Sequence, residues 1–353
     1  MSLALNNRRN ILIVEYLHAD RNAFQNASDS MRSEGRAMLL ALAHDAAKLP
    51  DVRATVVACA AAAKRLTLPH EVRLLTVSAT SPRELAESIV LAGESRDSVL
   101  PVAPEADGIL LQLVRAIRDS GIRVLTVDDA TLQACSDKWL TYQLLLEHNL
   151  PTVPTVLLKD GAEQEFGQRE GSEICVVKPR DGVGCEGVRR VTLAEANAFS
   201  TEAGNRSDSM ILQPWIDGES FSVALIGRGA RQRPDVLPLA TQAIEWRGEY
   251  AHYAGGTILP EIPARITTNV AKLCDAVVDA LDFRCGYLGI DLILPRDSGE
   301  FLITEINPRI CTSYVGYRRA TSLNLFSRLL DQPAASPLSW CEQNVAFACL
   351  DEN

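Results

Sequence analysis

Residues 285–309 constrain the fold of this chain more than any other stretch. They form two apolar runs on either side of a Pro-Arg-Asp-Ser-Gly turn, a pattern that predicts a β-hairpin. Asp291 lies in the first run, while Glu305 and Asn307 alternate in the second and therefore project from one face of a strand. Ionised carboxylates in apolar surroundings need a partner or a cation, and two carboxylates with an amide suit Mg²⁺ that carries nucleotide phosphates. The alternative is an exposed edge hairpin whose polar face lies in water.

The size and charge of the chain limit the classes of function. Its 353 residues predict two domains, or three closely packed ones, and 47% hydrophobic with 23% charged residues is typical of a globular protein. A formal net charge of −10 argues against sequence-independent binding to nucleic acid or to membrane phosphates, which requires basic clusters. The opening residues lack the apolar core of a signal peptide, and the longest apolar run, residues 56–63, is too short to span a bilayer.

The cysteines indicate a reducing compartment. There are nine of them, an odd number, and no Cys-x-x-Cys pair occurs, so neither a zinc site nor a disulfide framework is indicated. We therefore expect reduced thiols and a cytoplasmic location.

The first 130 residues alternate strand-like and helical patterns, which predicts a parallel, Rossmann-like sheet. No glycine fingerprint follows the first strand, so no dinucleotide is implied. The polar tract from His18 to Ser30 has no apolar period and is predicted to be a long loop or flap. After residue 151 the pattern changes to that of a smaller α+β unit.

A glycine-rich segment in this second region reads Gly182-Val-Gly184-Cys-Glu-Gly187. A dinucleotide site would require a helix directly after the last glycine. An extended run, residues 188–191, follows instead, so the segment is predicted to join two antiparallel strands. Its backbone N–H groups can still cradle phosphates, to which Lys178 would add a positive charge. A surface hairpin without a ligand is the alternative.

Three further features have both a functional and a structural interpretation. Lys138 lies in the first turn of a predicted helix, where most lysines are solvated. The segment Gln213-Pro-Trp215-Ile216 can wrap an adenine through its backbone, although an aromatic residue beside a chain reversal is usually core. Arg309 follows Asn307-Pro308 directly, and the proline would hold it over an anion bound by the metals.

The order of these features resembles the ATP-grasp superfamily over residues 125–330, with residues 11–125 similar to the domain that usually precedes it. The resemblance implies an α/β and α+β protein in three parts. They are a Rossmann-like pre-ATP-grasp domain at residues 1–128, a small lid subdomain with the glycine-rich hairpin at 129–218, and a C-terminal subdomain with the metal site at 219–353.

The resemblance also implies roles for individual residues. ATP phosphates would be held by Lys138, Lys178 and the glycine-rich segment. Adenine would be held by residues 213–216, which we call the hinge segment. Two Mg²⁺ ions, or Mn²⁺ in their place, would be held by Asp291, Glu305 and Asn307. Arg309 and Lys178 would act on the transferring phosphoryl group or acyl phosphate. The full set is Lys138, Lys178, Gly182, Gly184, Gly187, Gln213, Trp215, Ile216, Ser220, Asp291, Glu305, Asn307 and Arg309. Ser220 stands where many relatives carry a ribose-binding carboxylate, so ribose binding is the least supported of these roles.

Four segments, at residues 13–16, 34–39, 103–108 and 307–316, resemble the tyramine-glutamate ligase group of methanofuran biosynthesis. This resemblance implies an ATP-dependent, ADP-releasing ligase that joins the γ-carboxylate of glutamate to tyramine, a related aromatic amine or tyrosine through an acyl phosphate. The expected partners are these small molecules, and the pairing common among relatives allows a homodimer. The sequence names no base for the attacking amine.

Three alternatives stay open. The chain can be an ATP-binding regulatory protein without turnover, or a ligase of the same type for a different amino acid. Biotin-dependent carboxylation ranks below both, because the sequence contains no biotin-carrier segment.

Overall fold

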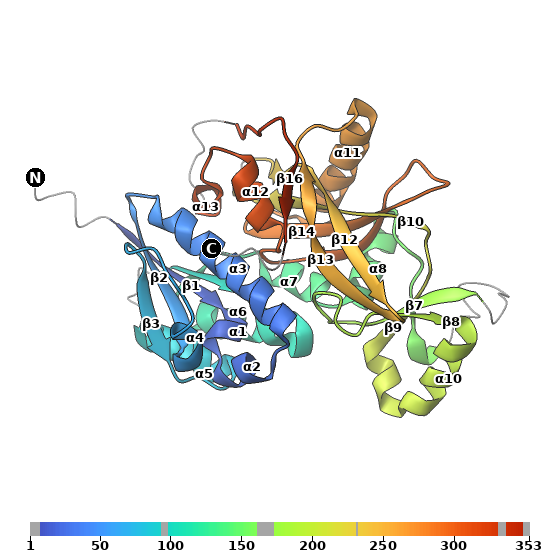
Figure 1. Cartoon of the computed structure of the whole chain (residues 1–353), viewed down its shortest axis with the longest axis horizontal. Coiled ribbons are helices and arrows are strands. Elements are labelled where there is room, and N and C mark those ends of the chain that lie inside the picture. The colour runs from blue at the N-terminus through green and yellow to red at the C-terminus, as the bar shows by residue number, and fades with distance from the viewer. Residues whose placement is uncertain (1–7, 93–97, 161–172, 231, 331–336, 349–353) are drawn as a thin grey trace, which may run out of the picture.

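The computed structural model describes residues 8–92, 98–160, 173–230, 232–330 and 337–348, with the backbone alone at residues 201–206. It contains two sheets, and the N-terminal one lies to the left of the larger second sheet in the view of Figure 1. Among the described helices, none is both long and apolar enough to cross a membrane. The eight cysteines in the described ranges are free thiols.

The N-terminal sheet is wholly parallel, as the alternating pattern predicts. Its five strands lie in the order β3-β2-β1-β4-β5. They are β1 (Arg9–Glu15), β2 (Val52–Cys59), β3 (Arg73–Val77), β4 (Ser98–Val102) and β5 (Arg123–Val124). The main helices packed on this sheet are α3 (Asp29–Ala47), α5 (Pro82–Ala92) and α6 (Ile109–Asp119). The apolar pattern of residues 124–127 predicts a strand, and the structure has there only the two-residue β5.

The prediction of a loop from His18 to Ser30 is wrong. The chain there forms α1 (Tyr16–Ala19) and α2 (Arg21–Asn26), and α3 follows at once. Side-chain caps make these short helices possible: Glu15 accepts from the backbone N–H groups of Leu17 and His18, and Asp20 accepts from that of Ala23. Helices this short are set by caps and tertiary packing and carry no apolar period.

The second sheet is antiparallel, and its strands follow the order β15-β14-β10-β12-β13-β8-β7-β9-β6. They are β6 (Val156–Leu157), β7 (Ile174–Pro179), β8 (Arg189–Thr192), β9 (Met210–Pro214), β10 (Gly218–Ile226), β12 (Leu239–Arg247), β13 (Tyr250–Leu259), β14 (Tyr287–Pro295) and β15 (Leu302–Asn307). β11 (Asp235–Val236) pairs with β10, and β16 (Val345–Phe347) pairs with β13. The hairpin predicted at residues 285–309 is β14–β15.

The described residues also contain three short 3-10 helices, at Ala106–Gly108, Leu158–Asp160 and Gly204–Ser209, and seven more α-helices. They are α4 (Ala60–Ala63), α7 (Asp129–Cys135), α8 (Lys138–Glu147), α10 (Leu193–Ala203), α11 (Ala264–Leu281), α12 (Tyr314–Ala320) and α13 (Leu325–Arg328). The sequence after Arg309 predicts a loop that includes Tyr314, Gly316 and Tyr317, and this prediction is wrong, because these residues belong to α12. A Cβ on Gly316 would come within 2.6 Å of Phe347, so this glycine lets α12 pack closely on β16. The polar composition of residues 160–171 predicts a loop, and this segment lies almost wholly outside the described residues.

The clusters of buried apolar side chains do not coincide with the two sheets. One apolar cluster contains residues of both the N-terminal sheet and the β10–β14–β15 region, so these parts share a core. The segment with β6–β9 and α10 has its own small cluster, and it lies at the lower right of the molecule, reached by the long β12–β13 hairpin (Figure 1). A part that packs mainly on itself can change its position with little loss of core contacts, as a lid requires.

Candidate active site

The three hairpin residues predicted to bind metal lie together. Asp291 on β14 is directly opposite Glu305 on β15, and Asn307 is opposite Gly289. The side chain of Asn307 donates from Nδ2 to Asp291 Oδ2 at 3.1 Å, and Gln242 Nε2 donates to Asp291 Oδ1 at 2.8 Å. Burial and the nearby Glu305 carboxylate raise the pKa of Asp291 well above its usual value. A cation placed between these oxygens would relieve that repulsion.

The donor set is oxygen-rich and fits Mg²⁺ better than zinc. In the described ranges no group of three His, Cys, Asp or Glu side chains is arranged as metal ligands. The present cluster is not such a group, because its third member, Asn307, is an amide. The alternative of an exposed hairpin does not hold, because Asn307 is buried and Asp291 and Glu305 are partly buried.

Both predicted lysines face this oxygen cluster. Lys138, the first residue of α8, donates from Nζ to the carbonyl of Gly182 at 2.6 Å and lies 3.3 Å from Glu305 Oε1. Lys178, near the end of β7, is only 8% exposed. Burial lowers its pKa to about 8, although Glu305 acts in the opposite direction. Two buried lysines therefore lie beside two carboxylates in one cavity, and their positive charges would suit an anionic ligand.

The glycine-rich segment joins β7 to β8, which are antiparallel, as its sequence context predicts. Gly184, Cys185 and Gly187 have φ values of +60°, +66° and +72°. A Cβ on Gly187 would come within 2.9 Å of Pro179 Cγ, so glycine is required there for packing as well as for conformation. The tip of this hairpin lies over the oxygen cluster and lines the same cavity, which has a volume of about 250 Å³.

The hinge segment lines a second, contiguous cavity of about 620 Å³. Gln213, Trp215, Ile216 and Ser220 all border it, and Lys178 and Ser220 border both cavities. The Gln213 side chain is buried and donates to Thr155 Oγ1 at 2.8 Å, so it braces the strand internally. The backbone N–H of Trp215 donates to the Ile174 carbonyl.

Trp215 does not belong to the core, contrary to the structural interpretation. Its ring lies 5.3 Å from that of Trp246, and the guanidinium of Arg190 lies 5.2 Å from both ring centres. Sequence reasoning missed Trp246 as a site residue. Trp246 lines both cavities and comes from β12, more than thirty positions along the chain from the hinge segment.

Arg309 lies in the cavity, but its partner was not predicted. Its Nε donates to both carboxylate oxygens of Glu105, at 2.9 and 3.0 Å, across 204 positions of sequence. Burial lowers the pKa of Arg309, yet the Glu105 carboxylate outweighs that effect and holds the group charged. Glu105 follows β4, so the N-terminal sheet orients an arginine that lines the same cavity as Asp291, Glu305 and Asn307.

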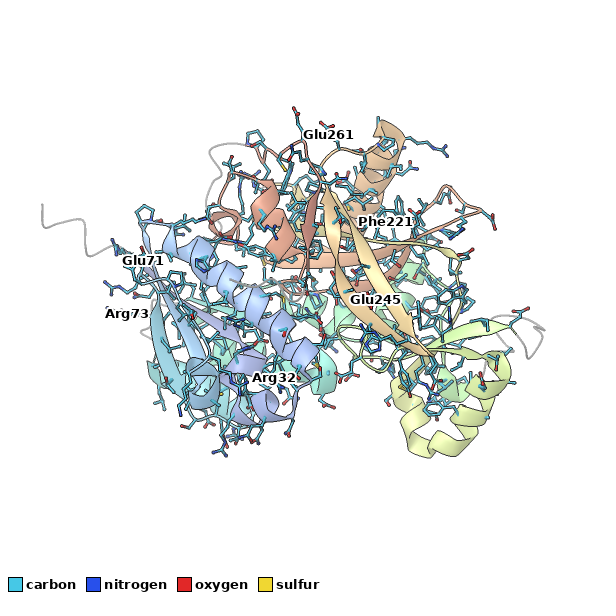
Figure 2. All side chains as sticks on the ribbon, viewed as in Figure 1. Arg32, Glu71, Arg73, Phe221, Glu245 and Glu261 are labelled. Carbon is cyan, nitrogen blue, oxygen red and sulfur yellow. The ribbon has the colours of Figure 1, made fainter. Side chains whose placement is uncertain are left out.

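The N-terminal domain contributes Glu34 as well. Arg32, which is labelled in Figure 2, lies near the N-terminal end of α3, and this end of the helix is the one nearer the middle of the molecule. Glu34 follows two residues later in the same helix. The Thr312 hydroxyl donates to Glu34 Oε2 at 3.2 Å. Glu34 therefore reaches the cavity formed by the second sheet.

Comparison with known proteins gives matches over most of the chain. A sequence model described as the ATP-grasp domain matches residues 135–313, and one described as the pre ATP-grasp 3 domain matches residues 54–131. The chain is 28% identical to the tyramine–L-glutamate ligase of Methanocaldococcus fervens over 240 residues, 68% of each protein. It is 29% identical to that of Methanocaldococcus jannaschii over 234 residues, 66% of this chain and 62% of the relative. The structure of biotin carboxylase from Campylobacter jejuni matches with a TM-score of 0.68 at 15% identity, covering 94% of this chain and 73% of that one, which shows a shared fold.

Proposed function

Because this chain belongs to the ATP-grasp family, whose sequence model matches just over half of it, we propose that it is an ATP-dependent carboxylate–amine ligase. Two buried lysines that face two carboxylates and an amide within one cavity support this activity most strongly. A regulatory protein that only senses ATP has no need for this metal-type set beside buried lysines.

We assign the phosphate end of the cleft to Lys138, Lys178 and the hairpin glycines 182, 184 and 187. The adenine end is the cavity beside Gln213, Trp215 and Ile216. The Trp215 N–H is engaged with Ile174, so the backbone donor to adenine would be Ile216 and the acceptor the Trp215 carbonyl. Ser220 borders both cavities, which is where the ribose of a bound nucleotide would lie. Residues 129–218 would form the lid half and residues 219–353 the metal half.

Asp291, Glu305 and Asn307 would hold the divalent cations, two Mg²⁺ ions in our proposal, with Mn²⁺ as a substitute. Such ions supply charge neutralisation to the β- and γ-phosphates. Lys138 lies against Glu305 in this structure and would turn to the phosphates when nucleotide binds.

The substrate carboxylate would attack the γ-phosphorus, so that an acyl phosphate forms and ADP leaves. Phosphoryl transfer needs little covalent help, and the positive charges of Lys178 and Arg309 would stabilise the transferring group. The amine would then displace phosphate to form the amide. Closure of the 182–187 hairpin over the cavity would exclude water, which otherwise hydrolyses the acyl phosphate.

The relatives named above suggest glutamate as the acid, through its γ-carboxylate, and tyramine or another aromatic amine as the acceptor, as in methanofuran-type coenzymes. The sequence identity to these relatives is below 30%, which is enough to support an amino acid and an amine as the substrate classes. A ligase for an amino acid other than glutamate is therefore the second candidate.

A mass-spectrometric screen of acid and amine pairs with Mg-ATP tests the proposal. We expect one pair to give an amide together with one ADP per product, and we expect Asn307→Ala to abolish both. Asp29→Asn, an exposed carboxylate on α3, is the matched control and should leave both unchanged. Binding of ATP without ADP release for any pair would favour the regulatory alternative and contradict the ligase proposal.

A further inference from the structure

Glu34 is a buried carboxylate at the meeting point of three elements. It projects from α3 and is 9% exposed. Thr312 donates to it from the loop after β15, and a Cβ on Gly184 would lie 3.5 Å from its Oε1. The side chain of Glu34 therefore lies between the N-terminal domain, the metal half and the tip of the glycine hairpin.

Two cavities meet at this carboxylate. One is the phosphate cavity described above. The other, about 50 Å³, is walled by apolar side chains together with Glu15, Glu34 and Arg309. Both cavities are bordered by Glu34, Gly184 and Arg309, so Glu34 and Arg309 occupy the passage between them.

The small cavity leads outward. A groove of about 580 Å³ shares Leu17, Met31, Pro104 and Val183 with it and runs between the short N-terminal helices and the glycine hairpin. A molecule with an apolar body and a terminal amine could lie along this path, with its nitrogen at Glu34.

The electrostatics of Glu34 suit a proton acceptor near neutral pH. Burial raises its pKa to about 7, while Thr312 and the Arg309 guanidinium act in the opposite direction. Cys185 on the hairpin and Glu15 on the neighbouring strand are the other titratable groups that border it. A general base works best when its pKa lies near the working pH.

We propose that Glu34 receives the amine substrate and takes the proton that its nitrogen loses as the amide forms. This inference rests on the ligase function proposed above. The amine enters as an ammonium ion, and Glu34 first takes one of its protons, which frees the nitrogen lone pair to attack the acyl-phosphate carbon. The C–N bond forms, the C–O bond to phosphate breaks, and phosphate leaves with the electron pair and the second N–H proton. Glu34 then releases its proton to solvent along the groove.

Trapping with hydroxylamine separates this role from acyl-phosphate formation. Hydroxylamine is small and largely neutral at pH 7, so at high concentration it captures an acyl phosphate as a hydroxamate without a bound base. We expect Glu34→Gln to form hydroxamate at close to the wild-type rate and to form amide at least about 100-fold more slowly, which is the lower end of the usual contribution of a general base. Glu34→Asp, which keeps a carboxylate, should recover part of the amide rate, and Asp29→Asn should match wild type in both assays.

Each outcome decides between the readings. An equal loss of hydroxamate and amide in a folded Glu34→Gln protein would mean that Glu34 only anchors Thr312, and unchanged amide formation would mean that another group takes the proton. Either result overturns the inference. If wild-type protein forms neither product, the ligase proposal itself fails, and the inference fails with it.

Discussion

Replacing Glu34 by Gln should stabilise the folded protein even though it impairs amide formation. Burial raises the pKa of Glu34 from 4.5 to about 7, so its ionisation is less favourable in the folded chain than in the unfolded one. This difference corresponds to about 3 kcal/mol. The contribution of Glu34 to stability is therefore most favourable below pH 4.5, declines as the pH rises, and is least favourable above pH 7. Glutamine has no charge to bury, and its amide oxygen can still accept from Thr312.

Urea unfolding of wild type, Glu34→Gln and Asp29→Asn at two pH values measures this effect. Linkage predicts that the advantage of Glu34→Gln over wild type grows from about 2 kcal/mol near pH 6 to about 3 kcal/mol near pH 8.5. These are upper values, because the buried amide also loses hydration. The neighbouring side chains of Arg309, Glu15 and Cys185 are common to both proteins, so their effects largely cancel. An advantage that is absent at the higher pH, or that does not change with pH, would refute the reasoning.

Two further substitutions test the nucleotide end of the cleft. Lys178→Ala removes a buried charged donor and should weaken ATP binding about 10- to 100-fold in calorimetry, whereas equal affinity would mean that Lys178 does not contact the phosphates. Gly187→Ala places a Cβ against Pro179 at φ +72°, so it should distort the hairpin and slow the formation of ADP. The free energy of unfolding of this variant should stay within about 2 kcal/mol of the wild-type value. Wild-type turnover in Gly187→Ala would show that the hairpin conformation is not needed for closure.

Much of the fold could be predicted because it follows local periodicity. The β14–β15 hairpin is specified by two apolar runs and a turn, and the alternation along β15 places Glu305 and Asn307 on one face. The glycine hairpin could be distinguished from a dinucleotide loop because an extended run follows Gly187. In each case the pattern lies within a few neighbouring residues.

The parts that escaped prediction depend on contacts between distant positions. The bond between Glu105 and Arg309 spans 204 positions, and no local pattern announces it. Glu34 looks like an ordinary polar position on an amphipathic helix, and only the packing of α3 against the Thr312 loop makes it a buried acid. The three-residue β16 is too short for a period and exists because β13 offers it a partner.

The apolar cluster shared by the two sheets has a consequence for engineering and evolution. Val14 and Leu110 pack in the same cluster as Val223 and Ile290, so the N-terminal and C-terminal halves of the chain bury each other's apolar side chains. A gene fragment that encodes only one of the two halves would expose the apolar residues of this shared cluster and tend to aggregate. Exchanging the N-terminal half between homologues would succeed only if the cluster residues were exchanged with it.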